Sequence, residues 1–188
     1  MKNDQPEYET LSQHSHDQYA KEYLADLLDE VAKVQLGYEV LAEARRVDVY
    51  VVPRASAKEE YYQELGVLGR MTRRACLLEP FRNPPSPEEV CQCLGKLFAV
   101  WHRLQLRQLR RKLPPLTSAE LPALWILSPT ASPALITGLG GQRQDDWGAR
   151  IHLLPPHFKT AIVAIHQLPN TPETALLRAL GKGTKQIT

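Results

Sequence analysis

Cysteine is scarce in this sequence of 188 residues, with only Cys76, Cys91 and Cys93 present. An odd number of cysteines without a C-x-x-C pair argues against a disulfide framework and a zinc knuckle, and it is typical of a reducing compartment. Apolar runs of the ~20 residues that a membrane-spanning helix needs are also missing, and the amino terminus is too polar for a signal peptide. We therefore expect a cytoplasmic protein that does not enter a membrane.

A phosphate-binding loop is missing as well. The loop from Gly140 to Asp146 has no phosphate-loop glycine spacing, and Gly181-Lys182-Gly183-Thr184 follows a predicted helix where a nucleotide-binding motif would precede one. No nucleotide cofactor is therefore expected.

Basic side chains are unevenly distributed, although the net charge of the chain is only +2. Residues 70–112 contain ten basic side chains and three acidic ones, so the rest of the chain is acidic. A concentrated basic zone is typical of contacts with the phosphates of a nucleic acid. A solvated helix face explains the same pattern equally well.

Hydrophobic periodicity and capping signals predict an α/β protein with helices on both sides of a sheet. The predicted helices begin at Ser15, Ser56, Ser86 and Thr171, and the third of them extends to about Lys112. The predicted strands are residues 35–42, 46–52, 75–81, 121–128, 151–154 and 160–166. The first two strands would form a hairpin. The length is ordinary for one domain, which we place at residues 14–188 after a flexible tail at residues 1–13.

Two of the predicted strands carry a single carboxylate each. Asp48 lies in the middle of strand 46–52, and Glu79 interrupts the apolar strand 75–81. A carboxylate in a sheet is costly unless a cation or hydrogen bonds satisfy it. Two carboxylates on neighbouring strands suggest a divalent metal ion, whereas nearby arginines are the more frequent partners of such groups.

The long helix that begins at Ser86 carries two further surface features. Arg103, Arg107, Arg110 and Arg111 recur at helical spacing and would form one basic ridge. Leu106, Leu109 and Leu113 lie away from the main apolar stripe, so this end of the helix is a candidate for contact with a partner chain.

The order of these elements resembles a known nuclease fold. A helix, two antiparallel strands, a third strand with an acidic residue, a long helix and a further strand form the αβββαβ core of the PD-(D/E)XK, or restriction-endonuclease-like, superfamily. The run His16-Asp17-Gln18-Tyr19-Ala20-Lys21 with Arg46-x-Asp48 is similar to its recombination-promoting nuclease and transposase-like branch. So are the runs from Leu124 to Ser132 and from Gln167 to Thr174.

The resemblance implies a Mg²⁺ or Mn²⁺ site in which Asp48 and Glu79 are the metal ligands. In this family a lysine two residues after the glutamate stabilises charge near the attacking water, but Phe81 occupies that position here. Arg82 is one residue further along and would need a bulge to reach the same face. Lys96, on the following helix, is the other candidate for this catalytic role.

Two functions therefore remain open at the level of sequence. The first is a metal-dependent DNA endonuclease that hydrolyses phosphodiester bonds, contacts the DNA backbone through the arginine ridge and cuts both strands as a homodimer. The second is a catalytically degenerate nuclease fold that binds nucleic acid or protein, with Asp48 and Glu79 paired to arginines.

Overall fold

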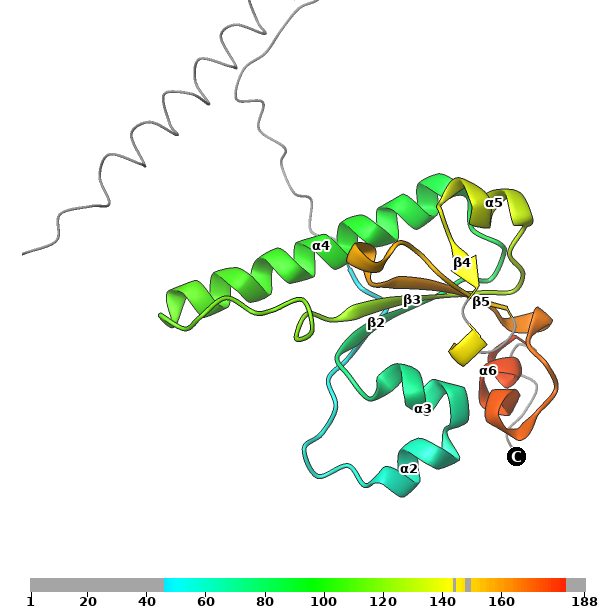
Figure 1. The fold of residues 1–188 in the computed structure, drawn as a ribbon, viewed down its shortest axis with the longest axis horizontal. Coiled ribbons are helices and arrows are strands. Elements are labelled where there is room, and N and C mark those ends of the chain that lie inside the picture. Colours follow the sequence, from blue (N-terminus) through cyan, green and yellow to red (C-terminus); the bar gives the residue numbers. More distant parts are fainter. Residues whose placement is uncertain (1–45, 144, 148–149, 182–188) are drawn as a thin grey trace, which may run out of the picture. The chain divides into compact units, whose positions relative to one another are not determined.

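A six-stranded mixed sheet organises the part of the chain that the structure describes, residues 46–143, 145–147 and 150–181 of a computed structural model (Figure 1). Its strands lie in the order β1-β2-β3-β6-β5-β4. Their bounds are β1 Val49–Val51, β2 Cys76–Pro80, β3 Ala123–Ser128, β4 Gln142–Arg143, β5 Ile151–Leu153 and β6 Thr160–Ala164. The three central strands, β2, β3 and β6, run parallel, and the outer pairings are antiparallel. The sheet is therefore mixed, as expected.

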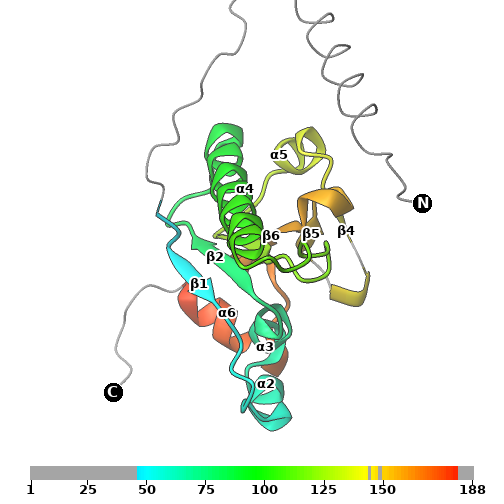
Figure 2. The ribbon, with the colours of Figure 1, turned by 90° about the vertical axis from the view of Figure 1, so that its left-hand side faces the viewer.

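Helices cover both faces of this sheet. They are α2 Glu59–Glu64, α3 Gly66–Thr72, α4 Pro87–Arg110, α5 Pro133–Gly138 and α6 Ala175–Leu180, with 3-10 turns η1 Asp145–Trp147, η2 Pro156–Phe158, η3 Ile165–Gln167 and η4 Pro172–Thr174. Helices α4 and α5 cover one face, α4 on the β2 side and α5 on the β5 side, and α3 and α6 lie on the other face (Figures 1 and 2). The predicted α/β class is confirmed. Among the described helices, none has the length and apolar character to cross a membrane.

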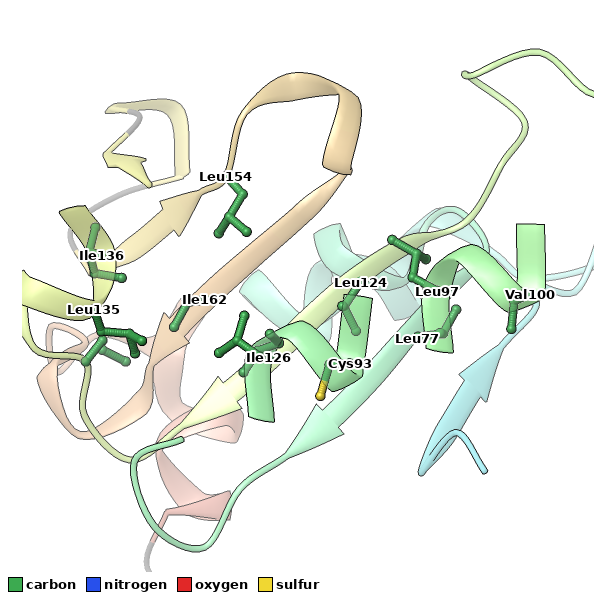
Figure 3. Close-up of a cluster of buried hydrophobic side chains, with 13 residues drawn as sticks. Leu77, Cys93, Leu97, Val100, Leu124, Ile126, Leu135, Ile136, Leu154 and Ile162 are labelled. Carbon is green, nitrogen blue, oxygen red and sulfur yellow. The ribbon is translucent and has the colours of Figure 1, made fainter. Parts of the chain in front are cut away.

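Helix α4 begins where the sequence predicts it to begin. The Ser86 side chain accepts a hydrogen bond from the Glu89 N–H, and the Glu89 side chain accepts one from the Ser86 N–H, which completes a capping box. The helix connects β2 to its parallel neighbour β3. Its buried residues Val90, Cys93, Leu97 and Val100 pack on the sheet, in the apolar cluster that Figure 3 shows together with Leu77, Leu124 and Ile126.

Asp48 differs from its prediction because it lies in a bend immediately before β1, not in the middle of a strand. Its backbone N–H donates a hydrogen bond to the Glu79 Oε1 atom at 3.3 Å. The acceptor is therefore a side-chain oxygen, whereas in a regular β-ladder it would be a backbone carbonyl. The Glu79 carboxylate therefore ends the β1–β2 ladder. The predicted tail, the helix from Ser15 and strand 35–42 lie outside the described residues, so the hairpin and the domain boundaries stay predictions.

The predicted helix at residues 56–68 is two helices. The chain turns between α2 and α3 at Gly66, whose φ of +57° lies in the left-handed region that glycine adopts without strain. The two helices then approach closely, because a Cβ atom at Gly69 would lie 1.9 Å from the backbone oxygen of Tyr62. The sequence therefore needs a residue without a side chain at this crossing.

We expect Gly69→Ala to lower the free energy of unfolding by about 2 kcal/mol, since a rigid backbone atom blocks the added methyl group. Gly138→Ala is the matched control, because a Cβ atom there meets nothing within 4 Å. Urea unfolding followed by circular dichroism measures both variants. Equal stability of the two variants would contradict the close crossing of α2 and α3.

Candidate metal centre

Glu79 is a carboxylate buried beneath α4. Side chains alternate along β2, so that Leu77 joins the cluster beneath α4 and Cys76 joins the cluster on the opposite face. Glu79 is two residues after Leu77, so its side chain lies on the same face of the sheet as that of Leu77 and points towards α4. Only 1% of its surface is exposed. A carboxylate this deeply buried requires a cation or several hydrogen bonds to offset its lost hydration.

Asp48 lies directly beside Glu79, on the neighbouring chain segment. Strands β1 and β2 pair antiparallel with Val49 opposite Leu78, so the next position places Asp48 opposite Glu79. Residues opposite each other in an antiparallel pair project to the same face of a sheet. Asp48 is exposed, in contrast to Glu79. The two carboxylates that were predicted as metal ligands are thus neighbours, one accessible and one buried.

Lys96 completes this group from α4. Its Nζ atom lies 2.6 Å from the Glu79 Oε2 atom, and 21% of its side chain is exposed. Burial alone would lower the pKa of Lys96, but the hydrogen bond and charge of Glu79, with smaller contributions from Cys93 and Asp48, raise the pKa above its usual value. Lys96 therefore keeps its proton near neutral pH. It can stabilise negative charge but cannot serve as a general base.

Cys93 lies one turn before Lys96 on α4 and is a contact that the sequence analysis missed. Its Sγ atom is 3.9 Å from the Glu79 Oε2 atom, within reach of a weak S–H donor. Burial, followed by the charge of Glu79, raises the pKa of the Cys93 thiol to about 11, so the thiol stays neutral. The site thus gathers two acidic side chains, Asp48 and Glu79, and one basic side chain, Lys96.

Arg82 does not join the site. The Phe81 N–H donates to the Leu127 carbonyl at 2.8 Å and Pro80 pairs with Leu127, so β2 continues regularly and no bulge redirects the following residue. Arg82 is exposed and forms no hydrogen bond or ion pair with Asp48 or Glu79. Phe81 itself packs against the apolar cluster under α4. Of the two candidate substitutes for the motif lysine, only Lys96 reaches Glu79.

Arginine pairs do not account for the two carboxylates within the described part of the chain. Arg73, one of the candidate partners, instead forms an ion pair with Glu59 and lies over the Tyr62 ring. The partner of Glu79 is a lysine. Its ammonium group is a single charge on a flexible side chain, whereas an arginine would bind the carboxylate through two parallel hydrogen bonds.

The donor set suits a hard divalent cation. Residues 46–143, 145–147 and 150–181 contain no group of three or more His, Cys, Asp or Glu side chains that could enclose a metal ion. Mg²⁺, however, is usually held by one or two carboxylates, several waters and the phosphates of a substrate. Asp48 and Glu79 supply two carboxylates, of which Asp48 is exposed and Glu79 is buried against Lys96 and Cys93.

The predicted arginine ridge lies in line with Lys96. At about 100° per residue, Arg103, Arg107 and Arg110 fall within about 40° of Lys96 around α4, and Arg110 lies about 21 Å further along the axis. All three are exposed, as is Arg111, which caps the helix and lies outside its last turn. Among the described residues, their side chains form no ion pair or hydrogen bond.

The chain that follows α4 leaves this ridge open. The Gln105 side chain donates to the Leu116 carbonyl and accepts from the Leu116 N–H, both at 2.8 Å, and Trp101 Nε1 donates to the Pro122 carbonyl. Gln105 is about 180° from Lys96 around the helix. The returning segment therefore packs on the opposite side of α4, where Figure 1 shows it running beside the helix.

An apolar hollow lies at the carboxyl end of α4. It is lined by Gln105, Leu106, Leu109, Leu113 and Pro115. Leu109 is 72% exposed, and Leu113 is exposed as well. Of the three leucines predicted to lie away from the main apolar stripe, Leu109 and Leu113 are exposed, and Leu106 is half-buried.

Comparisons with protein-family models, with curated proteins and with solved structures find no match for this chain. A functional assignment therefore rests on the residues of the site and on their geometry.

Proposed function

We propose that this protein is a Mg²⁺-dependent or Mn²⁺-dependent DNA endonuclease with a restriction-endonuclease-like core. The single observation that carries the proposal is the contact between Lys96 Nζ and Glu79 Oε2 at 2.6 Å, in a site where Asp48 is the neighbour of Glu79. In the family, a lysine on the strand supplies an ammonium group at the position that Phe81 occupies here. In this chain, Lys96 on α4 supplies that group instead. Two carboxylates and one lysine are the groups that the nuclease chemistry requires.

The order of the described elements supports the proposed core. Strand β1 is antiparallel to β2, β2 carries the buried carboxylate, α4 follows, and β3 returns parallel to β2. With α2 and α3 inserted between β1 and β2, these are the last four elements of an αβββαβ arrangement. The sequence assigns the first helix and strand of that arrangement to residues 14–45, which lie outside the described residues.

Each residue of the site has a distinct task in this proposal. A divalent ion bound by Asp48 and Glu79 would polarise the scissile phosphate and lower the pKa of the attacking water. The hydrogen bond from the Asp48 N–H to Glu79 Oε1 holds Asp48 beside Glu79, and the burial of Glu79 fixes its carboxylate. The protonated Lys96 amine stabilises the negative charge that develops on the phosphate. Phe81 packs against the apolar cluster under α4 and takes no part in the chemistry.

The arginine ridge supports DNA as the substrate. Arg103, Arg107 and Arg110 continue the line of Lys96 along an exposed helix face, without partners among the described residues. Such a row fits the phosphates of a nucleic-acid backbone, which contribute affinity without sequence specificity. Cutting both strands of a duplex would require two sites, and the exposed leucines Leu109 and Leu113 are the proposed contact of a homodimer.

Replacing Arg103, Arg107 and Arg110 together by glutamine should weaken DNA binding and reduce its dependence on salt. Each lost phosphate contact lowers the slope of log K against log salt by about 0.9, so a decrease of about 2.7 is expected for the triple variant. Fluorescence anisotropy of a labelled duplex in EDTA measures this slope. Replacing the exposed Arg54, Lys58 and Arg74 by glutamine removes the same charge elsewhere, and an equal effect of that control would contradict the ridge.

A degenerate binding module is the second candidate. The same ion pair favours it, because Lys96 already neutralises Glu79 and the described residues offer no third metal-binding side chain. In that case the ridge would bind nucleic acid and the carboxylates would contribute only to stability.

Cleavage of supercoiled plasmid and of single-stranded DNA distinguishes the two candidates. The nuclease should cut both with Mg²⁺ or Mn²⁺ and stop cutting in EDTA, and Glu79→Gln should be inactive. Glu64→Gln, at an exposed carboxylate, should cut like the wild type. A folded wild type that retains DNA in a salt-sensitive manner but does not cut it would establish the binding module.

A further inference from the structure

The Glu79 carboxylate already holds a cation at the position where a metal ion would bind it. Oε1 accepts the Asp48 N–H at 3.3 Å, and Oε2 receives the Lys96 ammonium at 2.6 Å and faces the Cys93 thiol at 3.9 Å. Both oxygens are closed off from solvent by these groups, since Glu79 is 1% exposed. A divalent ion therefore cannot approach Glu79 while Lys96 stays in place.

The ammonium and a divalent ion cannot share this oxygen. Both are positive, and their mutual repulsion at contact distance is strong in a partly buried site. Lys96 can leave, because its stem has four rotatable carbons and 21% of its side chain already reaches the surface. Glu79 cannot leave, because it is enclosed between β2 and α4.

We propose that Lys96 is an exchangeable placeholder for the metal ion. Without a divalent ion, the Lys96 amine neutralises Glu79. When the ion binds Asp48 and Glu79, the amine moves off Glu79 and pairs with a phosphate of the DNA on the arginine-ridge side of α4. This inference rests on the proposed function, since it assigns a second position to the lysine of that same site.

Exchange couples metal binding to DNA binding. A metal ion must displace Lys96, so its apparent affinity is the intrinsic affinity multiplied by the fraction of molecules in which Lys96 is off Glu79. A DNA phosphate offers the displaced amine a new partner and should therefore tighten metal binding. By reciprocity the metal tightens DNA binding by the same factor. The site would then assemble fully only when substrate and metal are both present.

The test is a titration of the full chain with Mn²⁺, in which electron paramagnetic resonance reports free Mn²⁺. Lys96→Met keeps the apolar stem and removes the competing charge, so it should bind Mn²⁺ at least about tenfold more tightly than the wild type. Lys58→Met, at an exposed lysine, is the control and should leave the affinity unchanged. Equal or weaker binding by folded Lys96→Met would overturn the exchange.

A second titration uses the wild type, so its result does not depend on whether Lys96→Met folds. A short duplex with a phosphorothioate backbone, which resists cutting, should tighten Mn²⁺ binding by the wild type, and an unchanged affinity would overturn the exchange. A third outcome separates the two proposals. If Asp48→Asn loses Mn²⁺ binding but the duplex does not change the affinity of the wild type, the metal centre is supported and the exchange is overturned. No binding of Mn²⁺ by the wild type would overturn the metal centre and the exchange together.

Discussion

Asp48→Asn should lower the rate of DNA cleavage about a thousandfold while DNA affinity and stability stay nearly unchanged. The substitution removes a metal ligand, and a metal ion contributes several kcal/mol to stabilising the transition state of phosphate hydrolysis, with each factor of ten in rate equal to about 1.4 kcal/mol. Stability should change by less than about 0.5 kcal/mol, because Asp48 is exposed and only its backbone N–H bonds to Glu79.

Single-turnover cleavage of a labelled duplex, anisotropy in EDTA and urea unfolding measure the three quantities separately. Asn preserves the shape of Asp48, and Glu64→Gln controls for the loss of one exposed carboxylate. Cleavage at the wild-type rate by Asp48→Asn would exclude this residue as a metal ligand. A parallel loss of cleavage and stability would instead identify Asp48 as a structural residue.

Lys96→Ala should lower the free energy of unfolding by about 3 kcal/mol in the absence of metal, because it leaves the buried Glu79 carboxylate without its cation. Glu79→Gln should cost less, about 1 kcal/mol, since the amide remains a hydrogen-bond partner and Lys96 can turn its amine towards water. The asymmetry follows from burial: Glu79 is enclosed, whereas Lys96 lies at the margin of the core.

Urea unfolding in EDTA measures both single variants and the double variant Glu79→Gln/Lys96→Ala. The double variant should be more stable than Lys96→Ala, because the charge that loses its partner is removed as well. Additive losses in the double variant would contradict the buried pair. Saturating Mn²⁺ should restore part of the stability of Lys96→Ala, since the ion replaces the missing cation on Glu79.

The parts of the fold with strong local signals could be predicted from sequence. Ser86 and Glu89 mark the start of α4 through a capping box that depends on neighbouring residues only. The apolar strand around Trp125 is buried on both sides, as its continuous hydrophobic run indicates. The neighbouring placement of Asp48 and Glu79 also followed from strand order.

Other features depend on contacts that no local pattern records. The break at Gly66 lies where the chain packs against the backbone of Glu173, far away in the sequence. Strand β4 at Gln142–Arg143 has only two residues, and its pairing with β5 defines it. The bend at Asp48, immediately before β1, is hydrogen-bonded to the side chain of Glu79, which is 31 residues away along the chain.

The residue that pairs with Glu79 could be predicted only in part from the sequence. The sequence offers Lys96 and Arg82 as replacements for the motif lysine at Phe81, and the choice between them depends on whether β2 bulges. A clue was present in α4, where Lys96 stands next to Leu97 in the apolar stripe. The spacing of apolar residues predicts a core-facing stripe of Val90, Leu94, Leu97, Phe98, Trp101 and Leu104. In the structure Cys93 and Val100 are buried instead, and Phe98 is 39% exposed, so the buried face of α4 lies nearer to Lys96 than predicted.

A crystal structure of the protein grown with Mn²⁺, with anomalous scattering recorded near the manganese absorption edge, tests the metal centre most directly. We expect one anomalous peak within about 2.0–2.6 Å of oxygens of both Asp48 and Glu79, with the Lys96 amine moved off Glu79. A structure with no peak at these carboxylates, and with Lys96 still bonded to Glu79 at millimolar Mn²⁺, would contradict the metal centre and favour the binding module.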